Sequence, residues 1–170
     1  MSGRLEWIRA VVREYERPLT LYATGILHDA DRAGDVVQDA FLKLCEQDRT
    51  AVESHVKPWL FAVCRNRALD ILRKDKRMFQ LKPEAAAARA GADSEPGQVM
   101  EIQESVSRVL ELLADLPERQ QEAIRLKFQH GHSYREISEV MDTNVSNVGV
   151  LIHTGMKTLR EKINRNAVER

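Results

Sequence analysis

The sequence lacks several features that would each point to a class of protein. In 170 residues it has two cysteines, and its basic and acidic residues balance at 26 each, so the net charge gives no sign of a polyanionic partner. Neither Cys45 nor Cys64 has a neighbour at the spacing of a metal or redox motif. Both stand in apolar helical patterns, so we expect two core residues in a reducing cytoplasm.

Long apolar segments are also missing. No run of residues is long and apolar enough to span a bilayer. The opening residues MSGRLEWIRAVV are interrupted by Glu6 and Arg9, unlike the apolar core of a secretory signal. We therefore expect a cytoplasmic protein without membrane insertion.

Residues that could build a catalytic or metal centre are scarce. The chain has no Gly-rich phosphate loop, and no pairing of a nucleophile with a base can be identified. The five histidines show no zinc-ligand spacing: His28, His55, His130, His132 and His153. Since His130 and His132 flank a glycine, a metal site there is an open alternative. We predict a protein that is not an enzyme and uses no cofactor.

The balanced total charge hides one basic and two acidic segments. Residues 65–82 contain seven Lys or Arg and two Asp, a net charge of +5. Residues 29–48 contain six acidic and two basic residues, a net charge of −4, and residues 83–105 contain five acidic and one basic, also −4. The chain therefore has a basic patch and two acidic ones.

Apolar residues recur at helical spacing and no segment alternates as a strand would, which predicts an all-α fold. Pro18 is expected to start a second helix after a break. Asp31 is expected to cap the next helix, and Pro58 to open a third. The inward-facing positions are predicted to be Leu5, Ile8, Val12, Tyr15, Leu19, Tyr22, Ile26, Ala33, Val37, Phe41, Leu44, Phe61, Cys64, Ala68 and Leu72.

The apolar pattern stops between residues 82 and 98. The segment KPEAAAARAGADSEPGQ is rich in Ala, Gly, Pro and acidic residues and offers nothing large to bury. It predicts a flexible acidic linker between two small helical domains, residues 1–81 and residues 99–170.

The second domain is predicted to contain a helix-turn-helix. A stripe of Ile102, Val106, Val109 and Leu113 precedes a helix from Pro117 to about Phe128, for which Gly131 suits the C-terminal cap. The motif itself follows. Its features are a capping box of Ser133 and Glu136, a turn at Asp142 that needs a left-handed residue, a cap at Asn144, and inward residues Ile137, Val140, Met141, Val145, Val148, Ile152 and Leu159. Such a motif is typical of DNA binding, although an ordinary helical hairpin has the same pattern.

Three segments resemble parts of the extracytoplasmic-function (ECF) sigma factors of the sigma-70 superfamily. DRAGDVVQDAFLKLCE resembles the segment that grips the clamp helices of bacterial RNA polymerase. VKPWLFAVCRNRALDILRKDKR resembles the promoter-melting helix, and LPERQQEAIRLKF with SYREISEVM resembles the fourth region. The resemblance covers nearly the whole chain, in the family's order and with its linker.

This resemblance implies a transcription initiation factor. It would bind the β′ clamp helices and the β flap of core RNA polymerase, melt and hold the minus-ten element, and place its helix-turn-helix on the minus-thirty-five element of promoter DNA. An anti-sigma factor is a further possible partner, and the free protein is expected to be a monomer.

The resemblance also assigns candidate site residues. Polymerase binding falls to Asp35, Val37, Gln38, Asp39, Phe41 and Leu42. Acid and amide groups beside apolar ones suit a partner that offers cations around an apolar seam, although a solvated face has the same composition.

Minus-ten binding falls to the basic helix, whose cations can neutralise phosphates and whose amide and aromatic groups can contact bases. Its candidates are Trp59, Arg65, Asn66, Asp70, Arg73, Lys74, Lys76 and Arg77. Asp70 is also expected to order Arg73 and Lys74, which follow at helical spacing. Core packing is the alternative for Trp59.

The second helix of the motif lacks cations. From Asn144 to Met156 there is no Lys, Arg, Asp or Glu, and Gly149 and Gly155 add a helix cost of up to about 1 kcal/mol each. The candidate DNA contacts are Ser133, Arg135, Asn144, Ser146, Asn147, Leu151, Thr154 and Lys157. Three interpretations are open: bases read through amides and through apolar contacts of Val150 and Leu151, weak DNA binding, or a protein partner on that apolar face.

Two other functions compete with transcription initiation. A helix-turn-helix regulator without a polymerase role would leave the acidic and basic segments of the first domain unexplained. An enzyme would need a catalytic group that the sequence does not offer.

Overall fold

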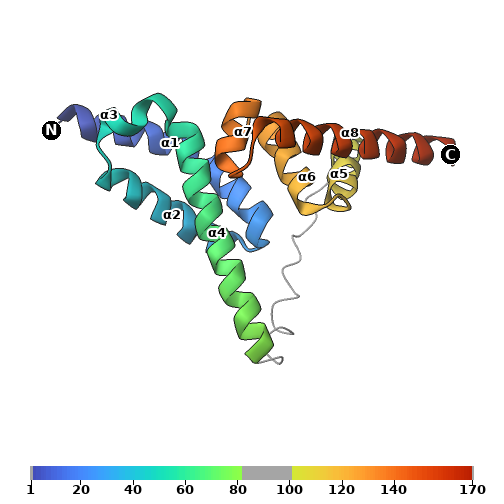
Figure 1. Cartoon of the computed structure of the whole chain (residues 1–170), viewed down its shortest axis with the longest axis horizontal. Coiled ribbons are helices and arrows are strands. Elements are labelled where there is room, and N and C mark those ends of the chain that lie inside the picture. The colour runs from blue at the N-terminus through green and yellow to red at the C-terminus, as the bar shows by residue number, and fades with distance from the viewer. Residues whose placement is uncertain (1, 82–100, 170) are drawn as a thin grey trace. The chain divides into compact units, whose positions relative to one another are not determined.

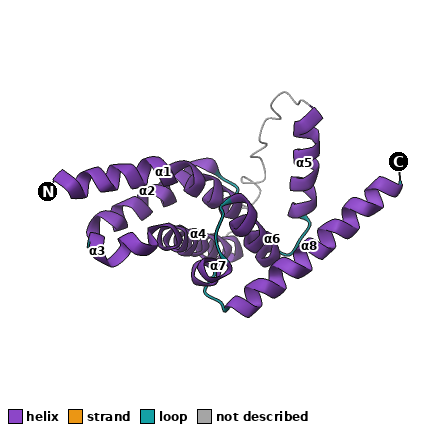
Figure 2. Cartoon of the chain, turned by 90° about the horizontal axis from the view of Figure 1, so that it is seen from above, coloured by secondary structure: helices purple, strands orange, loops and turns teal. Residues whose placement is uncertain are grey.

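The computed structural model describes residues 2–81 and 101–169, and every regular element in these ranges is helical (Figure 1, Figure 2). This confirms the predicted all-α fold. The chain divides into two compact units, Met1–Asp93 and Ser94–Arg170. No helix in the described ranges is long and apolar enough to cross a membrane. The linker predicted at residues 82–98 lies outside the described residues, and the predicted domain boundaries stay predictions.

The first unit is built on three long helices, α1 (Ser2–Leu27), α2 (Ala30–Glu46) and α4 (Val56–Leu81). Each of the three packs against the other two. A short helix, α3 (Arg49–Val52), and a 3₁₀ turn (Glu53–His55) lead from α2 to α4. The largest side chains buried at the centre are Leu19, Val36, Leu44, Leu60, Phe61 and Cys64. The Tyr22 ring joins them, with its centroid 5.1 Å from that of Phe61.

Two predicted helix starts in this unit are wrong. α1 continues through Pro18, because burial of Leu19, Tyr22 and Ala23 on the next turn offsets the hydrogen bond that proline cannot donate. α2 is capped by Asp29 and not by Asp31: an Asp29 carboxylate oxygen accepts the backbone N–H groups of Asp31 and Arg32 at 3.1 Å each. The chain turns into this cap at His28, which has a left-handed φ of 53°.

The predicted core residues of this unit are buried or half-buried, with three exceptions that are exposed. Cys64 is buried, as predicted, and this burial raises the pKa of its thiol to about 12. Cys45 is exposed, so its assignment to the core is wrong: it follows Leu44, the last buried residue of α2. Leu5 and Leu72, near the ends of their stripes, are also exposed.

The second unit contains α5 (Glu101–Ala114), α6 (Glu118–Ile124), α7 (Tyr134–Val140) and α8 (Val145–Val168). α6 and α7 both pack on α8, the longest helix of the unit. The cluster of buried residues at the α5, α6 and α8 junction is Leu113, Leu116, Ile124 and Leu159. Of the predicted stripe before Pro117, Val109 is exposed, and the side chains of Ile102 and Val106 lie outside the described part.

Helix α6 ends as its sequence predicts. A π-helical turn, Arg125–Gln129, extends it, and after the cap residue His130 the chain turns at Gly131, which has a left-handed φ of 68°. The backbone N–H of His132 then donates to the carbonyl oxygen of Leu126 at 2.9 Å, which closes the helix end. Gly131 as C-terminal cap is thereby confirmed.

The helix-turn-helix is present with its predicted local features. Ser133 and Glu136 form the capping box, at 2.9 and 3.1 Å, and Asn144 accepts the N–H of Asn147 at 2.7 Å. Asp142 has a left-handed φ of 51°. Of the predicted inward residues, only Val145 is exposed, because the first turn of α8 extends past the core.

Candidate partner and nucleic-acid interfaces

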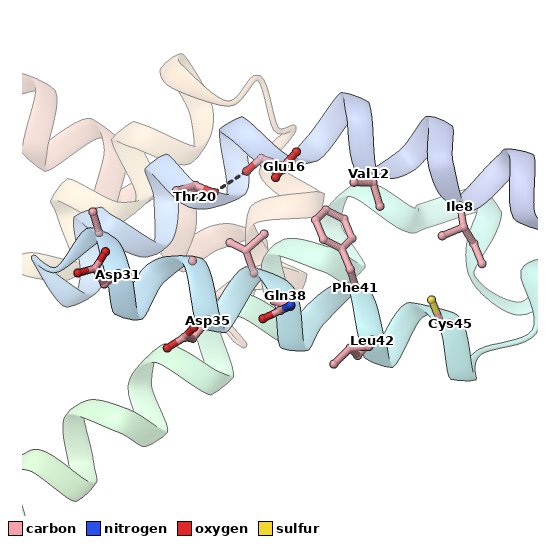
Figure 3. A pocket seen from close by; sticks show the side chains of 13 residues that line it. Ile8, Val12, Glu16, Thr20, Asp31, Asp35, Gln38, Phe41, Leu42 and Cys45 are labelled. Carbon is pink, nitrogen blue, oxygen red and sulfur yellow. Dashed lines mark hydrogen bonds between the residues drawn. The ribbon is translucent and has the colours of Figure 1, made fainter.

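A groove of about 530 Å³ runs between α1 and α2 (Figure 3). Its apolar wall includes Ile8 and Val12 from α1, with Phe41 of α2 directed between the two helices. Leu42 stands at the edge, 59% exposed. The polar residues that line the groove are Glu16, Thr20, Asp31, Asp35 and Gln38. The groove is therefore apolar inside and acidic at its rim. This arrangement suits a partner that bears apolar and cationic side chains.

The six residues predicted to bind polymerase do not share one environment. Asp35, Gln38 and Leu42 are exposed and Phe41 is half-buried, and all four line the groove. Val37 is only 3% exposed and forms part of the core beneath it. Asp35, Gln38, Phe41 and Leu42 are therefore the accessible residues of this set, and we call them the α2 face.

Asp39 faces α4 instead of the groove. Its Oδ2 lies 3.3 Å from Nε of Arg67, and both side chains are partly exposed. An ion pair of this exposure contributes little stability. It nevertheless places Asp39 in the seam between α2 and α4, a contact that residue spacing alone does not reveal.

The exposed face of α4 carries a polar stripe. Asn66, Asp70, Arg73 and Arg77 are all exposed and follow one another at steps of four, three and four, so they share one side of the helix. Asp70 pairs with Arg73 at 3.5 Å, which confirms the predicted ordering of that cation. Lys74 and Lys76 are exposed on neighbouring sides, and Trp59 is half-buried.

Arg65 differs from the other predicted phosphate contacts in its burial, and its role stays a prediction. It is only 9% exposed and lies on the side of α4 that carries the buried Phe61, Cys64 and Ala68. Arg65 is therefore much less accessible than Arg73 and Arg77, which are both exposed.

An ion pair between α2 and α4 was not predicted. Nη1 of Arg32 donates to Oδ2 of Asp75 at 2.7 Å, with the two side chains 27% and 24% exposed. The hydrogen bond with Asp75 is the main cause that raises the pKa of Arg32, against the opposing effect of burial. The two residues are 43 positions apart, so no local pattern could have indicated the pair.

The helix-turn-helix uses several of its predicted DNA contacts for its own structure. Ser133 and Asn144 are the helix caps, and Nδ2 of Asn147 donates to Oγ1 of Thr143 at 2.9 Å. Leu151 is half-buried and thus less accessible than the exposed Val150, and its assignment to the apolar face stays a prediction. The candidates left exposed around α8 are Arg135, Ser146, Val150, Thr154 and Lys157, with Val150 at 61% exposure.

Lys127 is a further cation near the exposed part of α8, and the sequence did not predict its position. Nζ of Lys127, on the π-helical turn, lies 5.3 Å from the centroid of the Tyr134 ring. An atom of the same ring would lie 3.8 Å from a Cβ at position 149, so the Tyr134 ring packs beside Gly149 of α8. The neighbouring Arg125 is half-buried, and burial lowers its pKa.

The His130 and His132 pair is part of the packing around this turn. The ring centroids lie 6.5 Å apart, and Nδ1 of the buried His132 lies 3.2 Å from the carbonyl oxygen of Leu126. Within the described ranges, no group of three or more His, Cys, Asp or Glu residues is placed to hold a metal ion.

Comparison with known proteins supplies a family. The model for sigma-70 region 2 matches residues 11–78, and that for sigma-70 region 4 matches residues 107–159. The chain is 24% identical over 159 residues to the ECF RNA polymerase sigma factor SigM of Bacillus subtilis, covering 93% of this chain and 96% of that protein. It is 29% identical over 136 residues to the ECF sigma factor RpoE of Cereibacter sphaeroides, covering 78% and 72% respectively.

A solved structure has the same fold. The sigma factor RpoE from Bartonella quintana, crystallised with the anti-sigma factor NepR, matches with a TM-score of 0.68 at 21% identity, over 92% of this chain and 96% of that one.

Proposed function

The chain belongs to the sigma-70 family as an ECF sigma factor, and we propose that its α2 face binds core RNA polymerase while α4 opens the promoter. The family membership makes it a transcription initiation factor that directs RNA polymerase to promoters. The observation that carries this function is the presence of regions 2 and 4 in their family order, matched over most of the chain. A helix-turn-helix regulator without a polymerase role would not account for the region 2 match.

The α2 face supports binding to the clamp helices of the β′ subunit. Asp35 and Gln38 offer a charged and an amide acceptor, and the apolar groove beside them accepts side chains from a helix. Asp39 and Val37 act behind this face, because one pairs with Arg67 and the other is buried. In such an interface the charged contacts give specificity, and burial of apolar side chains in the groove gives affinity.

The polar stripe on α4 supports binding and opening of the minus-ten element. Arg73 and Arg77 can neutralise phosphates, and Asn66 on the same side can hydrogen-bond a base edge. In the second unit, the exposed part of α8 is proposed to contact the minus-thirty-five element, with Arg135 and Lys157 as phosphate contacts. The family setting also makes the cytoplasm the proposed location, with the β flap and an anti-sigma factor as proposed further partners.

The first test is charge reversal on the α2 face. Asp35→Lys is expected to abolish co-purification with core polymerase and promoter-directed transcription, because it sets a cation against the cations expected of the partner. The matched control is Glu14→Lys, a reversal at an exposed acid of α1 that does not line the groove. Equal retention of polymerase by both variants in a pull-down would refute the assignment of this face, and failure of the unaltered protein to bind polymerase would refute the function.

A further inference from the structure

Asp75 is an acidic residue inside a basic run. Residues 73–77 read Arg, Lys, Asp, Lys, Arg, so an exposed carboxylate at the centre would repel the phosphates that its neighbours attract. The side chain of Asp75 does not lie on the side of α4 that carries the polar stripe. At about 100° per residue, Asp75 lies roughly opposite the stripe of Asn66, Asp70, Arg73 and Arg77 on the helix. There it meets Arg32 of α2, which neutralises its charge.

The pair lies where α4 leaves the core. The last buried residue of α4 is Ala68, and residues 76–81 are all exposed. Figure 1 shows these last turns of α4 running on past α2. Within the described ranges, Asp75 is the last residue of α4 with an ion pair to another helix. Beyond Ala68, Leu69 and Ile71 are still half-buried, and Asp75 is the last residue of α4 that is not exposed. Because the end of a helix frays without tertiary contacts, the ion pair of Asp75 supports the distal turns of α4.

The pair also joins α4 to the helix proposed to hold polymerase. Arg32 and Asp39 are seven residues apart and lie on the same side of α2. They pair with Asp75 and Arg67 respectively, so the two helices run antiparallel along the seam. Of the two pairs, Arg32 with Asp75 is the shorter and the less exposed, at 2.7 against 3.3 Å. It is therefore the stronger constraint on the distal half of α4.

We propose that Asp75 and Arg32 are positioning residues for promoter opening. Their ion pair keeps the distal half of α4 helical and holds it at a fixed rotation on α2, with Arg73 and Arg77 presented outward. This proposal rests on the proposed function, because it assigns the pair a role in opening the minus-ten element. It assigns neither residue a contact with DNA or polymerase.

For the effect of Asp75→Ala on promoter opening, the proposal predicts the opposite of what electrostatics alone would predict. Asp75→Ala removes an acid from a DNA-binding helix and replaces it by a better helix former, so charge and helix propensity alone would improve DNA binding. If the pair positions the helix, Asp75→Ala and Arg32→Ala each lower promoter opening by about fivefold, the worth of an ion pair of this exposure. Binding to core polymerase should stay unchanged, and the swap of Arg32→Asp with Asp75→Arg should restore opening.

The experiment has one arm with polymerase and one without. In the first, promoter opening is measured with purified core polymerase for the single variants and the swap, alongside polymerase affinity. Lys76→Ala is the matched control: it removes one cation from the same run but leaves every contact with α2 in place. It should lower the salt dependence of binding, and the Arg32 and Asp75 variants should not.

The second arm measures the helix in the free protein. Spin labels on Cys45 and on Gln80→Cys report the distance between α2 and the end of α4, and the buried Cys64 stays unlabelled because its thiol is inaccessible and largely protonated. The unaltered pair should give a narrow distance distribution and Asp75→Ala a broad one. An unchanged distribution, or opening by Asp75→Ala equal to or better than that of the unaltered protein, overturns the proposal. Failure of the unaltered protein to bind polymerase overturns the proposed function instead, while the distance measurement still decides the role of the pair.

Discussion

At the residue scale, the surroundings of a side chain decide its role more than its type does. Three arginines of α4 illustrate this: Arg65 is buried, Arg67 is paired with Asp39, and Arg77 is exposed. Only the last is free to meet a phosphate without breaking an internal contact. The sequence shows a single basic run, and the structure divides it into one buried residue, one residue paired with α2 and a group of exposed cations that are proposed to contact DNA.

The two glycines of α8 differ in the same way. A Cβ at position 149 would make an ordinary contact of 3.8 Å with the Tyr134 ring. A Cβ at position 155 would lie 2.6 Å from Cδ1 of Ile124 and 3.4 Å from Cβ of Gln120. Gly155 therefore permits the close approach of α6 to α8. The packing of these two helices offsets the free energy that glycine costs inside a helix. Gly149 has no such compensation.

These glycines give a matched prediction. Gly149→Ala should stabilise the second unit by up to about 1 kcal/mol, because alanine is the better helix former and has room. Gly155→Ala should destabilise it by about 1 kcal/mol, because the buried Ile124 has little space to move. Urea unfolding of both variants tests this, and adding Ile124→Val to Gly155→Ala should recover stability by removing the clashing methyl. Equal gains at both positions would show that α6 can shift at no cost.

At the element scale, the sequence predicts what depends on neighbours within one helix. The capping box at Ser133 and the cap at Asn144 were predictable because each depends on residues three positions apart. The left-handed Asp142 was predictable because it lies in the short turn between two predicted helices. Pro18 inside α1 was not, since burial on the following turns outweighs the local preference for a break. The Arg32–Asp75 pair was out of reach altogether, because only the packing of α2 on α4 brings its partners together.

The exposed part of α8 can be tested as a reader of bases. With Asn144 and Asn147 engaged in the turn, Val150 is the most exposed side chain suited to a thymine methyl. Replacing single thymines of the minus-thirty-five element by deoxyuridine removes that methyl. One such replacement should weaken binding of the holoenzyme about fourfold, the value of one buried methyl group.

The control for this experiment is in the protein. Val150→Ala should abolish the difference between thymine and deoxyuridine, and Ser146→Ala should preserve it. If no thymine position responds and Val150→Asp instead releases a regulatory protein, the apolar face of α8 belongs to a protein partner.

At the scale of the whole molecule, the two units differ in the charge of the helices that are proposed to contact DNA. The first unit has the dense cations of α4, and the stretch of α8 from Asn144 to Met156 has none. Phosphate neutralisation makes binding depend on salt, whereas methyl and amide contacts do not. The first unit should therefore supply most of the salt-dependent affinity for promoters, and the second unit should supply selectivity with little salt dependence.

This division predicts two slopes of log affinity against log salt concentration. In the full chain bound to polymerase, Arg73→Ala with Arg77→Ala should lower the slope for promoter DNA by about two, close to one for each phosphate that is no longer neutralised. Residues 98–170 alone should bind weakly with a shallow slope, owed mainly to Arg135, Lys157 and Arg160, with Lys127 beside Tyr134 as a further contributor. Removing the cations of α4 should thus lower the affinity for all promoters equally, because the phosphates are the same in every DNA sequence. A steep slope for the isolated second unit, or an unchanged one for the double variant, would place the phosphate contacts on the other unit and reverse the division.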